Sequence, residues 1–361
     1  MINVRDIGAV ARRFEIDGRF ACAAPYGNGH INDSYCAEFH LGSAVKRFFI
    51  QRINHNVFND PVALMENIQR VTSHLASQVA GEPDAVRRVL TLVPSRSGQA
   101  WIEDEEGNYW RAYRFIEGAR SYDTVQSPQQ AFQAARAFGQ FQKMLTTLPP
   151  PRLHDTIPDF HHTPRRFAAL ECAIAADAAG RAAQAMPEID FALARQPIVS
   201  GLIDAGLPER VTHNDTKFNN VLLDDLTGEA VCVIDLETVM PGLAPYDFGD
   251  MVRTTTSPAA EDERDLSRVE MQFPMFEALL RGYLSSAGGF LTRAEKRLLA
   301  FSGKLITFEI GIRFLADHLN GDTYFKVHRD GHNLDRCRTQ FALVRSIERQ
   351  EEAMNRLADS L

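Results

Sequence analysis

The residues best suited to chemistry lie past the middle of the chain. His213, Asp215 and Asn220 form an H-x-D-x-x-x-x-N pattern, in which the Asp and the Asn are five residues apart. A further carboxylate, Asp235, closes the apolar run of residues 231–234. The protein kinases use this set for phosphoryl transfer: one Asp accepts a hydroxyl proton, while an Asn and a second Asp hold Mg²⁺. The pattern therefore indicates phosphoryl-transfer chemistry.

Two apolar segments must position these groups. Residues 221–223 and 231–234 read as strands separated by a turn over residues 224–229. If the strands pair, Asn220 and Asp235 lie at the same end of a hairpin. Such a pair of oxygen ligands suits Mg²⁺, a hard cation that also binds nucleotide phosphates.

Other charged residues flank this hairpin. Asp215 lies on the loop before it, and Lys217 is placed to direct an ammonium group at a transferring phosphate. Glu237 either adds a carboxylate to the metal site or stays outside it. The charged groups of the segment therefore fit a base, a phosphate ligand and a metal site.

Composition bounds the rest of the protein. The 361 residues suggest about two domains or lobes. The net charge of −8 favours neither a nucleic-acid binder nor a protein that adheres to an anionic membrane. Five scattered cysteines form no C-x-x-C pair, and we expect reduced thiols. With no secretory leader and no long apolar segment, the sequence predicts a cytoplasmic protein.

The pattern of elements predicts a small strand-rich part followed by a larger helical part, an α+β arrangement. A helix should begin at Pro61, and an interlobe connection should lie near residues 115–121. The segments that read as strands in the first part are residues 20–25, 34–39, 46–53, 86–93 and 109–116. Helical patterns dominate after residue 128, including residues 129–148 and 164–186.

Six blocks give the chain a family resemblance. They are YGNGHINDSY (26–35), IQRINHNVF (50–58), RFIEGARSYD (114–123), THNDTKFNNVLLD (212–224), IDLETVMPGLAPYDFGD (234–250) and RFLADHLNGDTYF (313–325). With these blocks the chain resembles the aminoglycoside phosphotransferase-like family of small-molecule kinases, and within it the N-acetylhexosamine 1-kinases. The resemblance extends over nearly the whole chain.

The resemblance implies a protein-kinase-like two-lobe fold with a nucleotide-binding lobe over residues 1–117. The catalytic and sugar-binding lobe would be residues 118–361. It also implies ATP, Mg²⁺ and a sugar that is phosphorylated on its anomeric hydroxyl. Asp215 would be the catalytic base and Asn220 and Asp235 the metal ligands, with Lys217 beside the phosphates.

The nucleotide side follows from the same resemblance. Gly27, Asn28 and Gly29 would cover the phosphates, although a plain turn remains an alternative. Arg52 occupies the position of the usual strand Lys, and Glu66 would be its partner; an ordinary surface pair is the alternative, and Lys46 is a second candidate cation. The backbone from Phe115 to Glu117 would bind adenine.

The acceptor side rests on the last block. Arg313 and Tyr324 would contact the N-acetylhexosamine, with His30 and Asn32 as weaker candidates. An Arg313–Asp317 pair within one helical turn is the alternative. Asp247 and Asp250 would brace the catalytic loop, Asp250 by capping a helix start.

Several alternatives stay open from the sequence. One is a kinase for another small alcohol, such as an aminoglycoside, choline, homoserine or another sugar. Others are a non-catalytic nucleotide-binding regulator and a metallohydrolase that uses His213, Asp215 and Asp235. The sequence also leaves open the choice of sugar, the need for its acetyl group, ATP against GTP, and the oligomeric state.

Overall fold

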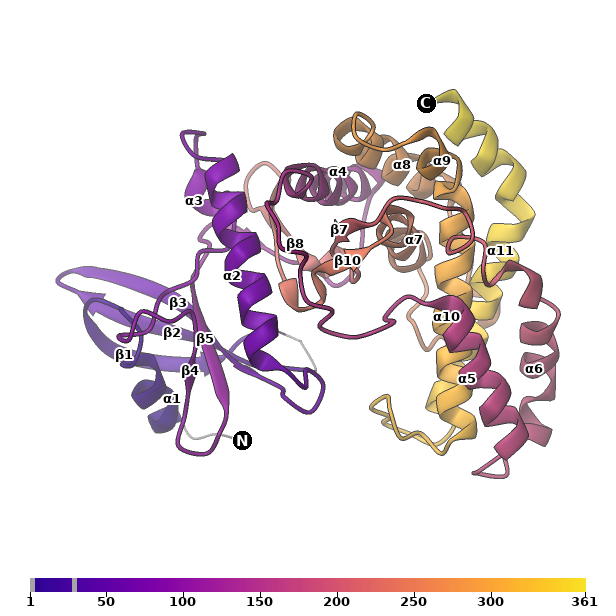
Figure 1. Cartoon of the computed structure of the whole chain (residues 1–361), viewed down its shortest axis with the longest axis horizontal. Coiled ribbons are helices and arrows are strands. Elements are labelled where there is room, and N and C mark those ends of the chain that lie inside the picture. The colour runs from indigo at the N-terminus through magenta and orange to yellow at the C-terminus, as the bar shows by residue number, and fades with distance from the viewer. Residues whose placement is uncertain (1–3, 28–30) are drawn as a thin grey trace.

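A computed structural model describes residues 4–27 and 31–361. The candidate ligand residues Asn28, Gly29 and His30 therefore lie outside the described residues. Figure 1 shows a sheet-rich part formed by the first third of the chain and a helical part formed by the rest. The predicted α+β arrangement is confirmed.

The N-terminal part is built on an antiparallel sheet with strand order β1-β2-β3-β5-β4. Its strands are β1 (Arg19–Pro25), β2 (Asp33–Leu41), β3 (Ala44–Ile53), β4 (Ile102–Glu103) and β5 (Tyr109–Arg114). The helices are α1 (Val4–Ala11), α2 (Pro61–Gln78) and the short α3 (Ala85–Arg88).

The two faces of this sheet pack against different partners. Side chains alternate between the faces along a strand. Phe48 and Ile50 of β3 pack in a cluster with α1, whereas Ile53 packs in the main core with α2. Position 52 therefore shares the face of Ile50 and points away from α2.

Helix α2 begins where the sequence predicts. Pro61 is its first residue, and Asp60 caps it by accepting a hydrogen bond from the Ala63 N–H at 2.9 Å. Leu64, Ile68, Val71 and Leu75 form its buried face. This face joins α2 to the core that it shares with α4 (Pro128–Leu145).

The expected strand at residues 86–93 is wrong. Asp84, with φ 58°, precedes the short helix α3, and only Leu92 makes an isolated bridge to Tyr113. Arg87 on α3 donates to the carbonyls of Glu117 and Gly118 and to the Asp224 carboxylate. These contacts with distant residues outweigh the local strand pattern.

The C-terminal part carries two small sheets, β6-β8-β9 and β10-β7. Its strands are β6 (Ala119–Arg120), β7 (Arg210–Thr212), β8 (Val221–Asp224), β9 (Ala230–Val233) and β10 (Met240–Gly242). The long helices are α4, α5 (Thr163–Ala176), α7 (Ala244–Thr255), α8 (Phe273–Ala287), α10 (Leu299–Leu319) and α11 (His332–Ser360). The shorter ones are α6 (Met186–Leu193), α9 (Arg293–Arg297) and the 3-10 turns η1 (Ala182–Ala185), η2 (Gln196–Ile198), η3 (Phe218–Asn220), η4 (Leu236–Thr238) and η5 (Leu266–Arg268).

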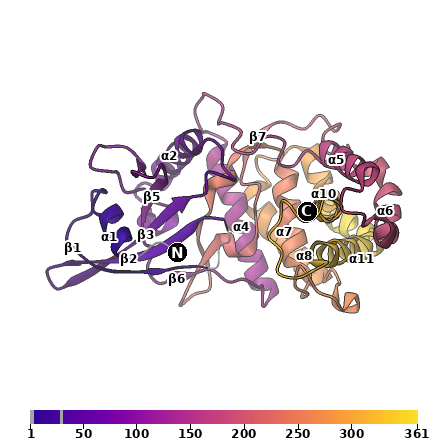
Figure 2. The same cartoon turned by 90° about the horizontal axis from the view of Figure 1, so that it is seen from below.

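Helix α10 forms the centre of the helical part. Nearly all of its residues are buried, as expected for a helix that is covered on every side. Helices α5, α6 and α11 pack around it, and Figures 1 and 2 show this group at the end of the molecule far from the sheet β1–β5. The predicted helix over residues 164–186 is shorter than expected, because Asp177 is left-handed, with φ 37°, and ends α5.

The lobe boundary at residues 117 and 118 stays a prediction. Strand β6 pairs with β8, so residue 119 already belongs to a sheet of the C-terminal part. Within the described residues, no helix has an apolar stretch long enough to cross a membrane.

Candidate active site

The predicted hairpin is present. Strands β8 and β9 are antiparallel, with Val221 opposite Val233, and the Ile234 N–H donates to the Asn220 carbonyl at 2.9 Å. This pairing places Asn220 and the residue after Ile234, Asp235, at the same end of the hairpin. Asp235 is left-handed, with φ 63°, and leads directly into η4.

Asp215 lies at this end of the hairpin and is surrounded by donors. The Asn220 amide donates to the Asp215 carbonyl at 2.8 Å and to its Oδ2 at 3.2 Å. The Lys217 ammonium lies 3.0 Å from Asp215 Oδ1. Burial opposes ionisation of Asp215, but Lys217 and the nearby His213 and Arg253 outweigh it and lower the pKa. Asp215 is therefore held as a carboxylate.

Asp235 has the opposite electrostatics. Burial, followed by the negative charges of Glu237 and Asp215, raises its pKa well above the ordinary range. Oε2 of Glu237 is also buried and receives no hydrogen bond from the described part of the chain. The site therefore concentrates negative charge that a cation would relieve.

Asn220 and Asp235 are the pair that could hold such a cation. Among the described residues, no three His, Cys, Asp or Glu side chains gather closely enough to bind a metal by themselves. A metal at this site would complete its shell with amide oxygens, water or ligand oxygens, as Mg²⁺ commonly does.

Glu237 is fixed by a buried ion pair that our sequence reasoning missed. Arg111 of β5 pairs with Glu237 Oε1, and its Nε also donates to Gln51 of β3 at 3.0 Å. Both side chains of the ion pair are at most 3% exposed. Burial opposes the charge of Glu237, yet Arg111 outweighs it and lowers the pKa of this carboxyl. The pair joins the sheet to the segment that follows Asp235.

Asn32 strengthens this junction. Its amide donates to Glu237 Oε1 at 2.7 Å, and its carbonyl oxygen accepts from the Asn54 N–H at 2.9 Å. The structure thus places Asn32 beside Glu237, in the segment after Asp235, whereas its contact with an acceptor stays a prediction. Gly27 has a left-handed backbone, with φ 84°, and its role in covering phosphates stays a prediction.

The expected Arg52–Glu66 pair is not formed. Arg52 donates to Asp33 at 2.8 Å and to Asn108 at 3.2 Å, whereas Glu66 contacts His154 at 2.7 Å. The reason is the alternation of side chains along the strand, because Arg52 points to the face of the sheet that α2 does not cover. Arg111, not Arg52, contacts the segment after Asp235, and Gln51 accepts a hydrogen bond from Arg111.

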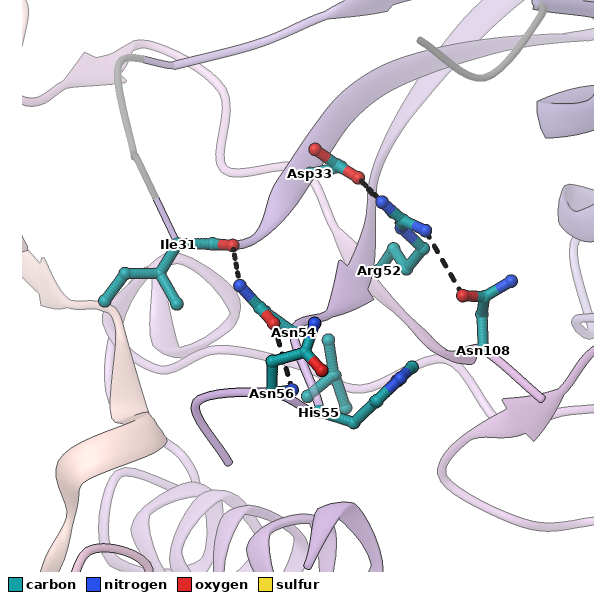
Figure 3. Close-up of a pocket in the computed structure, with 8 residues that line it drawn as sticks. Ile31, Asp33, Arg52, Asn54, His55, Asn56 and Asn108 are labelled. Carbon is teal, nitrogen blue, oxygen red and sulfur yellow. Dashed lines mark hydrogen bonds and ion pairs between the residues drawn. The ribbon is translucent and has the colours of Figure 1, made fainter. Parts of the chain in front are cut away.

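Figure 3 shows where Arg52 lies instead. It lines a pocket of about 180 Å³ together with Asp33 and Asn108, and the Asn54 side chain closes another side by donating to the Ile31 carbonyl. The remaining residues that line the pocket are Ile53, His55 and Asn56.

The segment expected to bind adenine is partly engaged already. The Phe115 N–H donates to the Arg47 carbonyl at 3.2 Å, and the Glu117 carbonyl accepts from Arg87 at 3.0 Å. The Arg47 guanidinium lies 4.2 Å from the centre of the Phe115 ring and pairs with the Glu117 carboxylate. Contact of this backbone with a nucleotide stays a prediction.

Asp247 holds the backbone of the loop that carries Asp215. It accepts hydrogen bonds from the N–H groups of His213 and Asn214 at 2.8 and 2.7 Å. Burial raises its pKa despite these bonds. Asp250 does not cap a helix start as expected, because α7 begins at Ala244 and Asp250 lies in its interior, paired with Arg253 at 2.9 Å.

On the acceptor side, Arg313 of α10 is surrounded by aromatic rings. Its guanidinium carbon lies 5.5 Å from the ring centre of Phe160, 5.9 Å from that of Tyr324 and 5.6 Å from that of Phe325. Arg166 is close enough that burial and the charge of Arg313 lower its pKa. The group is therefore aromatic and cationic.

Asp317 holds the segment that carries Tyr324. Its two carboxylate oxygens accept from the N–H groups of Thr323, Tyr324 and Phe325 at 2.8–2.9 Å. The Asn333 amide donates to it at 2.8 Å. The alternative pair of Arg313 with Asp317 is not among the contacts of Asp317. Its oxygens accept hydrogen bonds from the backbone N–H groups instead.

The geometry can now be compared with known proteins. A family model described as "Phosphotransferase enzyme family" matches residues 24–280. A solved microcompartment-associated aminopropanol kinase is similar, with 16% identity, a TM-score of 0.62 and coverage of 98% of this chain and 99% of that chain. An aminoglycoside phosphotransferase from Alicyclobacillus acidocaldarius has 12% identity, a TM-score of 0.61 and coverage of 100% and 97%.

A third solved structure is a spectinomycin phosphotransferase in complex with ADP and spectinomycin. It has 13% identity, a TM-score of 0.59 and coverage of 97% of this chain and 99% of that chain. The three likenesses confirm the predicted protein-kinase-like α+β fold. The family model covers most of the sheet and the hairpin that carries Asn220 and Asp235. The chain therefore belongs to the phosphotransferase enzyme family.

Proposed function

We propose that this protein transfers the γ-phosphoryl group of ATP to the anomeric hydroxyl of an N-acetylhexosamine, GlcNAc or GalNAc, with Mg²⁺. The product would be the sugar 1-phosphate. The observation that carries the proposal is the position of the Asp215 carboxyl group, which contacts Asn220 and Lys217 at the end of the β8–β9 hairpin that leads to Asp235.

The charges of the site support a metal-bound nucleotide. Asn220 and Asp235 would hold Mg²⁺. Burial, and then the negative charges of Glu237 and Asp215, raise the pKa of Asp235, so a cation would stabilise its carboxylate. Bound Mg²⁺ would neutralise charge on the nucleotide phosphates. The spectinomycin phosphotransferase was solved with ADP, which supports the assignment of ATP as donor.

The chain's own residues would orient and activate the acceptor. Asp215, a carboxylate with a lowered pKa, would accept a hydrogen bond from the hydroxyl and take its proton as the phosphoryl group transfers. Asn220 fixes the direction of this carboxylate through its Oδ2. Lys217, whose pKa Asp215 raises, stays an ammonium and would bind the transferring phosphoryl group.

The acceptor side supports a neutral sugar. Arg313 donates hydrogen bonds in a fixed fork that suits hydroxyl or acetamide oxygens. Tyr324, 65% exposed, adds a hydroxyl. The neighbouring Arg166 adds positive charge, and the oxygens of Asp317 are engaged by the backbone. These surroundings would repel an amine, and they favour a sugar over choline or an aminoglycoside.

Another small alcohol remains the second candidate acceptor. The fold is shared with kinases named for aminopropanol and aminoglycosides, so the fold by itself does not select a sugar. The purified protein should be given ATP, Mg²⁺ and a panel of acceptors, with ADP release as the readout. The panel is GlcNAc, GalNAc, glucose, choline, homoserine and an aminoglycoside. Turnover of an amine but of no hexosamine would sink the sugar assignment.

Location and assembly are separate expectations. The five cysteines, all of which lie in the described part of the chain, are free thiols, which is consistent with a reducing compartment such as the cytoplasm. The partners we propose are the nucleotide and the sugar.

A further inference from the structure

His161 connects the catalytic loop to the helix that carries Arg313. Its Nδ1 lies 2.8 Å from Oε1 of Glu309 on α10, and its Nε2 lies 2.9 Å from the Asn214 carbonyl oxygen. The imidazole and the carboxylate are 5% and 0% exposed. The ring also stacks on Tyr246 of α7, with 5.4 Å between ring centres.

The two hydrogen bonds determine where the protons are. A carbonyl oxygen only accepts, so Nε2 of His161 must carry a proton. Nδ1 faces a carboxylate, which also accepts, and a bare nitrogen there would repel it. Oε2 of Glu309 accepts from the Thr163 hydroxyl at 2.6 Å, as an ionised carboxylate can. With Glu309 ionised, the arrangement is an imidazolium paired with a carboxylate.

The surrounding charges agree with this assignment. Burial opposes the charge of His161, but Glu309, the Asn214 carbonyl and Asp250 on α7 outweigh it and raise the pKa. Burial likewise opposes the charge of Glu309, but His161, Arg313 and the Thr163 hydroxyl lower its pKa. Arg166 of α5 also faces Glu309, and its positive charge favours the carboxylate. Tyr246 of α7 faces both groups, because it stacks on His161 and lies near Glu309.

The pair acts on the peptide that joins Asn214 to Asp215. Asn214 is left-handed, with φ 65°, and its N–H is bound by Asp247. His161 binds the carbonyl of this peptide. The N–H of the same peptide, which belongs to Asp215, donates to His213 Nδ1 at 3.3 Å. The orientation of the peptide sets the direction in which Asp215 leaves the backbone. Glu309 lies one helical turn before Arg313, so the same ion pair connects both sides of the proposed site.

We propose that His161, fixed by Glu309, holds the Asn214–Asp215 peptide in place relative to α10 and Arg313. The proposal deepens the function proposed above and rests on it for the roles of Asp215 and Arg313. His161 is a positioning residue, because it acts through the Asn214 carbonyl.

Glu309→Gln separates the charge from the hydrogen bonds. A glutamine can donate to Nδ1 of a neutral His161 and still accept from Thr163, while Nε2–H keeps its bond to Asn214. In this background, His161→Gln places an amide near the former Nε2 and keeps a donor for Asn214. His161→Asn is one methylene shorter and loses that donor. These two double variants form a matched pair.

The kinetic prediction distinguishes positioning from mere stability. We expect Glu309→Gln and its His161→Gln double variant to lower kcat by less than about tenfold, because both keep a donor on the Asn214 carbonyl. The kcat of the His161→Asn double variant should fall by on the order of 10- to 100-fold, while its KM for ATP stays unchanged. Each kcat is calculated per nucleotide-binding site, so that unfolded protein is not counted. Glu351→Gln is the control, since it removes the partner of Lys304 on α10, 2.6 Å away, without contact to the loop.

Two further measurements need no acceptor. Histidine ¹⁵N spectra recorded over a pH series should show that His161 of the wild type stays doubly protonated above the ordinary pKa of histidine. In Glu309→Gln they should show the neutral Nε2–H tautomer at the same pH. Amide hydrogen exchange over residues 212–218 should be faster in the His161→Asn double variant than in its His161→Gln counterpart. If the wild type phosphorylates no hexosamine, the proposed function fails, but these two readouts still test the pair. A neutral His161 in the wild type, or equal exchange and kcat in the matched variants, would overturn the inference.

Discussion

Asp215 combines ionisation with a fixed direction. Its pKa is lowered against the effect of burial, and Asn220 and Lys217 contact different oxygens at 3.2 and 3.0 Å. A carboxylate held in this way needs little reorganisation when a hydroxyl approaches. Its contribution to rate should therefore come from orientation and from proton acceptance.

We expect Asp215→Asn to lower kcat on GlcNAc by roughly 10²- to 10⁴-fold, because the amide cannot accept the proton. ADP release by the purified protein measures this effect, and binding of ATP serves as the control for folding. Undiminished ADP release would refute the role of Asp215 as base.

The His161–Glu309 pair should make stability depend on pH. The pKa of His161 is raised above its ordinary 6.5, so its contribution is complete below pH 6.5 and is lost as pH rises through the raised pKa. The pKa of Glu309 is lowered below 4.5, so its contribution is present above pH 4.5 and is lost as pH falls through the lowered pKa. The joint contribution of the two groups to stability is therefore largest between pH 4.5 and pH 6.5.

Glu309→Gln should accordingly destabilise the protein more at pH 5.5 than at pH 9. Denaturant unfolding of wild type and variant at both pH values measures the difference. A loss of stability that is equal at the two pH values would show that the pair is not ionised.

The sequence could predict that Asp215, Asn220 and Asp235 lie at one end of a hairpin, because their spacing is local and the strands are apolar; their roles in catalysis and metal binding stay predictions. It did not identify Arg111, whose partner Glu237 lies 126 residues away. The sequence did carry a signal for its position, since Arg111 shares one face of the predicted strand with Tyr109 and Tyr113. The same alternation would have shown that Arg52 points away from Glu66.

At the scale of elements, the buried Arg111–Glu237 pair joins β5 to η4. Replacing Arg111 with Met would leave an uncompensated carboxylate in the interior. We expect a loss of about 3–5 kcal/mol in the free energy of unfolding. Denaturant titration measures it, and Arg111→Met with Glu237→Gln should recover part of the loss.

The matched control is Arg47→Met. Arg47 lies on the same sheet, and its pair with Glu117 is 37% and 58% exposed. Its loss should cost at most about 1 kcal/mol. Equal effects of Arg47→Met and Arg111→Met would contradict the importance of the buried junction.

The segment after α10 depends on Asp317, whose oxygens accept three backbone N–H groups. Asp317→Asn replaces one acceptor with a donor that faces other donors. We expect the KM for the acceptor to rise about tenfold, because hydrogen bonds to a charged group are lost and Tyr324 is no longer held. The KM for ATP is the internal control, and a rise in both constants would argue against a local effect.

Elements were easier to predict where local signals are strong. Asp60 and Pro61 marked the start of α2, and the hairpin turn between residues 224 and 229 was correct. Residues 86–93 were wrong, because contacts of Arg87 with Glu117 and Asp224 fix a short helix there. Asp250 was wrongly placed at a helix start, because Leu243, the residue before α7, provides no side-chain cap. Pro245, near the first helical position, was the signal for the true start.

At the scale of the molecule, the site joins a sheet to a helical body. Arg111 and Asn32 reach from the sheet to Glu237, while Asp247, His161 and Glu309 hold the catalytic loop from the helical side. The net charge of −8 says nothing about this site, where Lys217, Arg313 and Arg166 supply local positive charge. The overall fold followed from the pattern of elements and the resemblance, whereas these long-range contacts required the structure.

The most direct test of the central claim is the identity of the product. The purified protein should be incubated with ATP, Mg²⁺ and each member of a hexosamine panel, and the products followed by ³¹P NMR with coupling to the sugar protons. The account predicts a phosphate on C1 of GlcNAc or GalNAc, formed by wild type and not by Asp215→Asn. Phosphate on another carbon, or turnover of an amine alcohol in place of any hexosamine, would contradict it.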